Sequence, residues 1–170
     1  MKKYIVITIL LLSPIICNGE EKYFVIPPKS PLKYSHYVKD QLEDHFTGTV
    51  TLSGKMVFQP NSDMEEILVQ FDLDDASSRK LPYINKLGPV KTVGIAENRE
   101  TYINRLSDDQ KKKLLAGSSP SIEYLTTIVA TDYLAEVSCD HTNFWVKIVR
   151  VVSSKLIHNP VKMKAGEKPC

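Results

Sequence analysis

The sequence predicts a mainly β fold, a small five-stranded antiparallel barrel with a helix between its third and fourth strands and a short helix near the N-terminus. Two observations predict the barrel. Apolar and polar residues alternate in successive segments after residue 48, which is the pattern of half-buried strands. The strongest helix signal follows the third of these segments. An open antiparallel sheet with helices on one face is the alternative that the same elements allow.

The first elements are expected to be a proline-rich lead-in and a short helix. Residues 20–33 contain three prolines, which favour extended backbone. Residues 35–46 are predicted to be helical, because a serine can cap their start and Val38, Leu42 and Phe46 share one face at four-residue spacing.

Three segments with a period of two are predicted to be strands, and the first two are predicted to form a hairpin. Residues 49–59 carry Gly54 in one slot of their apolar face, where a missing side chain suits a bend or bulge. Residues 65–75 repeat the alternation after a polar turn, and residues 90–96 give the third strand. The predicted inward residues of the hairpin are Val50, Leu52, Met56, Phe58, Ile67, Val69, Phe71 and Leu73.

The best helix begins after Ser107 and ends at Gly117. Ser107 and Gln110 match a capping box, and glycine is the usual residue just past a helix end. Residues 122–139 are rich in β-branched and aromatic residues and predict one bent strand or two. Residues 144–153 predict the final strand.

This order of elements favours an OB-like barrel, because such barrels combine a bent first strand with a helix between strands three and four. The predicted organisation is an extended lead-in and short helix over residues 20–45, a β-rich core domain over residues 46–153 and a basic C-terminal tail over residues 154–170.

Residues 1–19 are predicted to be a removable secretory signal peptide. Two lysines precede an apolar run that is too short to span a bilayer, and small residues precede a cut after Gly19. Lipid anchoring at Cys17 is disfavoured, because two bulky isoleucines precede it where lipoprotein signals have a small residue. We therefore expect an exported protein, periplasmic or secreted, that does not span the membrane.

Residues 138–141, SCDH, place a thiol, a carboxylate and an imidazole side by side. Cys139 is the last inward residue of its predicted strand. An even pair of cysteines in an exported chain predicts a disulfide between Cys139 and Cys170. One alternative is a buried, inert thiol at Cys139, and another is an enzyme that uses Cys139 and His141. The enzyme is disfavoured, because the negative charge of Asp140 opposes a thiolate and His141 would lie in the turn.

No metal or cofactor is predicted. The four histidines lack a ligand spacing, and no phosphate-binding or dinucleotide-binding glycine pattern occurs. The acidic run Asp72, Asp74 and Asp75 lacks the turn glycine and the distal glutamate of a calcium loop.

The C-terminal part of the sequence is basic and holds the predicted interaction surface. Residues 147–168 contain six basic residues and one acidic residue, although a solvated face is the simpler interpretation of such a block. The surface consists of Trp145, Lys147, Arg150, Lys155, Lys162 and Lys164.

These observations favour an exported, non-enzymatic binding or interaction module of the bacterial cell envelope, whose partner is a protein or an envelope component. A periplasmic inhibitor or immunity-type protein is a narrower version of this hypothesis. Removing residues 1–19 takes away two lysines and leaves 20 basic and 20 acidic residues. This balance argues against a nucleic acid partner, because such binding depends on many phosphate contacts.

Overall fold

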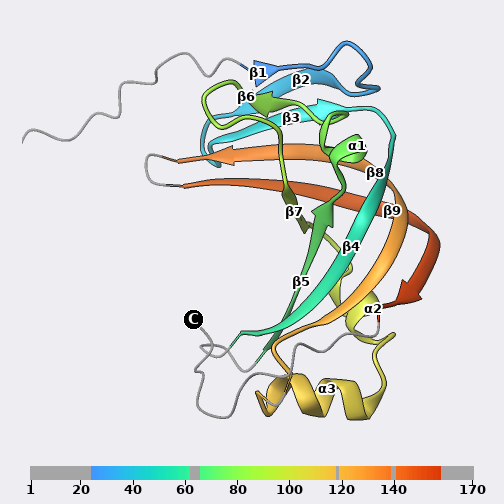
Figure 1. Cartoon of the computed structure of the whole chain (residues 1–170). Coiled ribbons are helices and arrows are strands. Elements are labelled where there is room, and N and C mark those ends of the chain that lie inside the picture. The colour runs from blue at the N-terminus through green and yellow to red at the C-terminus, as the bar shows by residue number, and fades with distance from the viewer. Residues whose placement is uncertain (1–23, 62–65, 118, 139–140, 158–170) are drawn as a thin grey trace, which may run out of the picture.

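The computed structural model describes residues 24–61, 66–117, 119–138 and 141–157, most of which lie in strands (Figure 1). The strands are β1 (Phe24–Val25), β2 (Lys33–Val38), β3 (Glu43–Thr47), β4 (Val50–Asn61), β5 (Glu66–Leu73), β6 (Tyr83–Ile84), β7 (Thr92–Ile95), β8 (Ile122–Val137) and β9 (Thr142–Leu156). The helices are α1 (Asp75–Ser78), α2 (Arg99–Ile103) and α3 (Asp108–Leu115).

Five strands close a barrel. β4 pairs with β5, β5 with β7, β7 with β9 and β9 with β8, and β8 returns to β4. The helices α2 and α3 lie between β7 and β8 in the chain, which is between the third and fourth barrel strands. The predicted small barrel is therefore confirmed. It is mixed rather than antiparallel, because β7 and β9 run parallel. The OB-like assignment stays an interpretation of this strand order.

The strands β8 and β9 are longer than the barrel requires, and β8 also supports a further pair of strands. Residues 122–130 of β8 pair with β4, whereas residues 133–136 pair with β3, which pairs in turn with β2. Between the two parts, Asp132 has a φ of 49° and the β8–β9 register shifts. Such a bulge bends a strand. The predicted segment is thus one bent strand, and Figure 1 shows β8 and β9 continuing from the barrel toward β3.

The helix predicted over residues 35–46 is wrong, because this segment forms the β2–β3 hairpin. The four-residue spacing of Val38, Leu42 and Phe46 imitated a helical face, yet only Phe46 is fully buried and Leu42 is exposed. The far part of β8 presents backbone N–H and C=O groups, and β3 pairs with them as a helix could not.

Gly54 permits a close approach of the backbones of β4 and β5. It pairs with Leu73 on one side and with Thr126 of β8 on the other. A Cβ atom at this position would lie 2.0 Å from the carbonyl oxygen of Asp72, so no side chain fits. Figure 1 shows β4 as a curved strand, and its register with β5 and β8 runs unbroken past residue 54, so these pairings contain no bulge at the glycine.

The core fills the barrel and continues under the β2–β3 hairpin. The predicted inward residues of β4 and β5 are buried, except that Leu73 is half-buried and packs against the core. Tyr133 is fully buried, its ring stacks on Phe144, and its hydroxyl donates a 2.6 Å hydrogen bond to the carbonyl of Pro82. Burial raises the pKa of Tyr133 well above its ordinary value.

The helix α3 begins and ends as its sequence predicted. The Ser107 hydroxyl accepts from the Gln110 backbone N–H, and the Gln110 side chain accepts from the Ser107 N–H at 2.9 Å. Gly117 follows the helix with a φ of +65°. The predicted helix is confirmed, and its Leu114 packs into the core.

Several predictions fall outside the described residues and stay predictions. These are the signal peptide over residues 1–19, the disulfide between Cys139 and Cys170, and the positions of Lys162 and Lys164. Within the described part of the chain, no helix has both the length and the apolar character needed to cross a bilayer.

Candidate functional site

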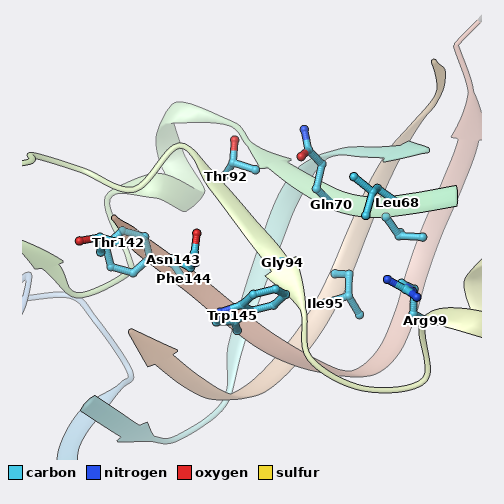
Figure 2. Close-up of a pocket in the computed structure, with 11 residues that line it drawn as sticks. Leu68, Gln70, Thr92, Gly94, Ile95, Arg99, Thr142, Asn143, Phe144 and Trp145 are labelled. Carbon is cyan, nitrogen blue, oxygen red and sulfur yellow. The ribbon is translucent and has the colours of Figure 1, made fainter. Parts of the chain in front are cut away.

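The candidate site is a groove on the outer face of β5, β7 and β9. Along β5, Val69 and Phe71 point into the core, so Leu68 and Gln70 face outward. The groove has a volume of about 380 Å³ and adds one side chain from α2 (Figure 2). It is lined by Leu68, Val69, Gln70, Thr92, Gly94, Ile95, Arg99, Thr142, Asn143, Phe144 and Trp145.

The floor of the groove is an indole ring seated on a glycine. Gly94 and Trp145 are direct partners in the parallel β7–β9 pairing. A Cβ atom on Gly94 would lie 2.3 Å from Cε3 of Trp145, so the ring occupies the space that a side chain would need. Figure 2 shows the ring lying against β7 at this point. Trp145 remains partly exposed, which leaves part of the ring open to a ligand.

Neutral polar side chains surround this floor. The Gln70 amide accepts from Gln59 at 3.5 Å and donates to Asp72 at 3.4 Å, and the Asn143 amide donates to Glu136 at 3.5 Å. These distances exceed the 2.9–3.0 Å usual for strong N–H···O bonds, so both amides retain most of their hydrogen-bonding capacity. The Thr92 hydroxyl is better engaged, since it donates to Asp72 at 2.9 Å.

Arg99 lies at the end of the groove formed by α2. Its Nη2 is 3.0 Å from Oε2 of Glu66, and both side chains are partly exposed. Arg99 also lines a second hollow of about 260 Å³ together with residues of β5, α2 and α3. Arg99 is therefore a lining residue shared by two separate hollows on the barrel surface.

The structure separates the residues of the predicted interaction surface. Trp145 lies in the groove, and Lys147, two residues further along β9, forms a 2.8 Å ion pair with Glu97, which raises the pKa of Lys147. Arg150 is exposed beyond the groove, whereas Lys155 lines a different, hydroxyl-rich hollow. Among the described residues, Trp145 is the member of that surface that lines the groove.

Ser138 and His141, the described residues of the SCDH segment, lie between β8, which ends at Val137, and β9, which begins at Thr142. His141 therefore lies in the connection between the two strands, as predicted. Ser138 N–H donates to the His141 carbonyl at 3.0 Å, and the Ser138 hydroxyl lies 2.8 Å from Nδ1 of His141. Cys139 itself lies outside the described residues, so a role beside His141 stays a hypothesis.

Sequence reasoning missed most of the groove. The sequence predicts Gln70 on the outward face of its strand, places Asn143 just before the final strand rather than in it, and gives Gly94 no role beyond the third strand. The strand prediction did place Leu68 and Gln70 on the outward face of β5. The parallel pairing that brings Gly94 under Trp145 joins residues far apart in the chain, and no local pattern encodes it.

Neither metal-ligating side chains nor similarity to known proteins identifies the function of the groove. In the described ranges, no three potential metal-ligating side chains gather at one point. The chain matches no protein-family model, no curated protein and no solved structure. The chemistry of the groove is therefore the basis for assigning a function.

Proposed function

We propose that the protein is an exported, non-enzymatic binding module of the bacterial cell envelope, and that the groove over β5, β7 and β9 is its ligand site. The observation that supports this most directly is the seating of Trp145 on Gly94. A concave, partly apolar surface with a few convergent polar groups is the usual form of a small-ligand site.

The barrel gives this site a rigid base. Trp145 and Gly94 belong to paired strands, and Gln70 pairs with Gly94 from the other side in β5. A ligand would thus meet groups held in fixed register, which lowers the entropy lost on binding. Export follows from the predicted signal peptide and belongs to the same proposal.

The sequence contains a single tryptophan, and it lies in the groove, so intrinsic fluorescence reports directly on the site. We would screen neutral oligosaccharides, short peptides, oligonucleotides and lipid headgroups by Trp145 emission and by amide chemical shifts. At least one class is expected to shift the emission and to move amide signals of the groove.

A matched pair of β9 variants makes the screen specific. Trp145→Ala is expected to abolish the chemical-shift changes, whereas Val152→Ala, at an exposed position outside the groove, is expected to leave them intact. If every class left the groove amides unmoved, or if the changes mapped to another surface, the groove would not be the binding site.

A further inference from the structure

We propose that the ligand of this groove is an uncharged, pyranose-based glycan, bound with one sugar ring on Trp145. The inference rests on the proposed function, since it names the class of ligand for the same site. Three features of the groove support it. These are the aromatic floor, the neutral amide side chains at the rim, and the pairing of the charge of Arg99 with Glu66.

The aromatic floor suits the apolar face of a sugar ring. A pyranose presents several C–H bonds on one face, and the face of an indole carries partial negative charge that attracts such hydrogens. Trp145 is held against Gly94, so its ring is fixed before a ligand arrives. A fixed platform loses little conformational entropy when a sugar stacks on it.

The rim suits hydroxyl groups. A sugar hydroxyl both donates and accepts, and so does the side-chain amide of glutamine or asparagine. Gln70 and Asn143 make protein contacts of 3.4–3.5 Å, so their strongest hydrogen bonds remain to be made. Both residues line the groove beside the ring of Trp145.

The charge of the groove disfavours an anionic ligand. Among its described lining residues, Arg99 carries the charge, and Glu66 lies 3.0 Å from its guanidinium. A phosphate or carboxylate placed against Arg99 would also meet Glu66. Lys147, which neighbours Trp145 along β9, is paired in the same way with Glu97. Nucleic acids and acidic peptides need cations that are not already neutralised.

A second hollow beside the groove offers room for more than one sugar unit. The groove holds about 380 Å³, and the second hollow, which shares Arg99 with it, holds about 260 Å³. Ile103 and Leu115 contribute apolar surface to the second hollow. A glycan that passes over Arg99 would reach this hollow, so an oligosaccharide is expected to bind more tightly than its monosaccharide.

The test uses the folded protein and linear hexasaccharides of glucose, N-acetylglucosamine, mannose and xylose, with hexagalacturonate, an oligothymidylate and an oligoglutamate peptide as charged probes. Binding is measured by calorimetry and by Trp145 emission. At least one neutral hexasaccharide is expected to bind, and its dissociation constant should change less than about twofold between about 50 and about 500 mM salt, because no ion pair forms.

Variants test each feature of the groove. Trp145→Ala should weaken binding of the neutral glycan about tenfold or more, by analogy with stacking platforms for other rings. Gln70→Ala and Asn143→Ala should each weaken it by about threefold or more. Val152→Ala, at an exposed position outside the groove, should bind like the unchanged protein.

Two results would overturn the inference. One is that no neutral hexasaccharide binds. The other is that the charged probes bind more tightly, with a steep salt dependence and a loss in Arg99→Gln. If peptides or anions still moved the groove amides, the proposed binding site would survive and only the glycan would be rejected. If no ligand of any class moved them, both proposals would fail.

Discussion

At the scale of single residues, Gly94 and Trp145 depend on each other. The indole lies where a Cβ atom of residue 94 would be, and it covers backbone that glycine leaves bare. An aromatic side chain packed across a neighbouring glycine restores the contacts that the missing side chain forfeits. The pair therefore stabilises the β7–β9 junction and also forms the floor of the groove.

A methyl group at Gly94 tests this arrangement. Gly94→Ala is expected to displace the Trp145 ring, shift its emission to the red and lower the free energy of unfolding by about 1–3 kcal/mol through overpacking. The control is Gly88→Ala, where no atom lies within 4 Å of an added Cβ. Gly88→Ala lowers the free energy of unfolding through its backbone conformation, but it should leave the Trp145 emission unchanged. Equal emission changes in the two variants would contradict the assigned contact.

Tyr133 shows how burial couples stability to pH. Its hydroxyl bonds to Pro82, and its pKa is raised well above the ordinary value of 10.0 because burial disfavours the phenolate. The stabilisation that follows from this shift is complete below the unfolded pKa of about 10 and is lost as the pH rises toward the folded pKa.

Tyr133→Phe separates the hydrogen bond from the titration. Near neutral pH the variant should be less stable by about 1–3 kcal/mol, because the buried carbonyl of Pro82 loses its donor. Above about pH 10 the unchanged protein should lose up to about 1.4 kcal/mol per pH unit more than the variant. Urea unfolding at several pH values measures both. A difference that stayed constant to pH 11, about one unit above the unfolded pKa, would contradict the shift.

At the scale of elements, α3 is held at its start by a reciprocal pair of hydrogen bonds. Ser107→Ala removes the side-chain half of the capping box, and we expect it to lower the free energy of unfolding by about 1 kcal/mol. Lys112→Ala, at an exposed position of the same helix, should change it by less than about 0.5 kcal/mol. Urea denaturation compares the two, and equal losses would show that the cap contributes nothing specific.

The close approach of β4 and β5 at Gly54 gives a stronger prediction. Gly54→Ala would place a Cβ atom 2.0 Å from a backbone oxygen of β5, and neither strand can move without disturbing the barrel. The loss should be about 3 kcal/mol or more, at the upper end of overpacking effects. Thermal and urea unfolding would measure it. A near-neutral Thr51→Ala, at an exposed position of the same strand, would show that the effect belongs to the glycine, whereas a tolerated Gly54→Ala would contradict the close approach.

Local patterns predicted the elements well where the period was unambiguous. The strands β4, β5 and β7, the helix α3 and the bent β8 followed from alternation, capping and β-branched composition. The β2–β3 hairpin did not, because a four-residue spacing of a few apolar residues is typical of a helical face but can also arise by chance. What decides this segment is the free edge of β8, which lies about ninety residues further along the chain.

At the scale of the whole molecule, the site was harder to predict than the fold. The sequence predicted Trp145 as part of an interaction surface but grouped it with lysines and an arginine from the final strand and the basic tail. In the structure, its partners in the groove come from β5, β7 and α2, and the nearby Lys147 is neutralised by Glu97. Tertiary pairing assembles such a surface, so composition along one segment cannot reveal it.

The proposed export gives a prediction about the whole chain. The exported protein should begin at Glu20, and Cys139 and Cys170 should resist alkylation until reduction. Reduction should lower the free energy of unfolding by roughly 3–4 kcal/mol, according to the loop-entropy model. Intact mass before and after reduction measures cleavage and oxidation together. A mass that includes residues 1–19 would contradict export through a cleaved signal, and a freely alkylated Cys139 would restore thiol chemistry as a subject for assay.

The closing role of β9 has a consequence for how the chain is made. This strand pairs with β7 and with β8, so the barrel has no complete hydrogen-bonded ring until residues 142–156 have been synthesised. The ring can therefore close only after β9 has been made, because the β7–β9 pairing joins Gly94 to Trp145 across a long stretch of chain and such non-local pairings form slowly. Until then the nascent chain lacks the pairings that would lock the barrel. That is the condition a protein needs if it is to pass through a translocation channel before it folds.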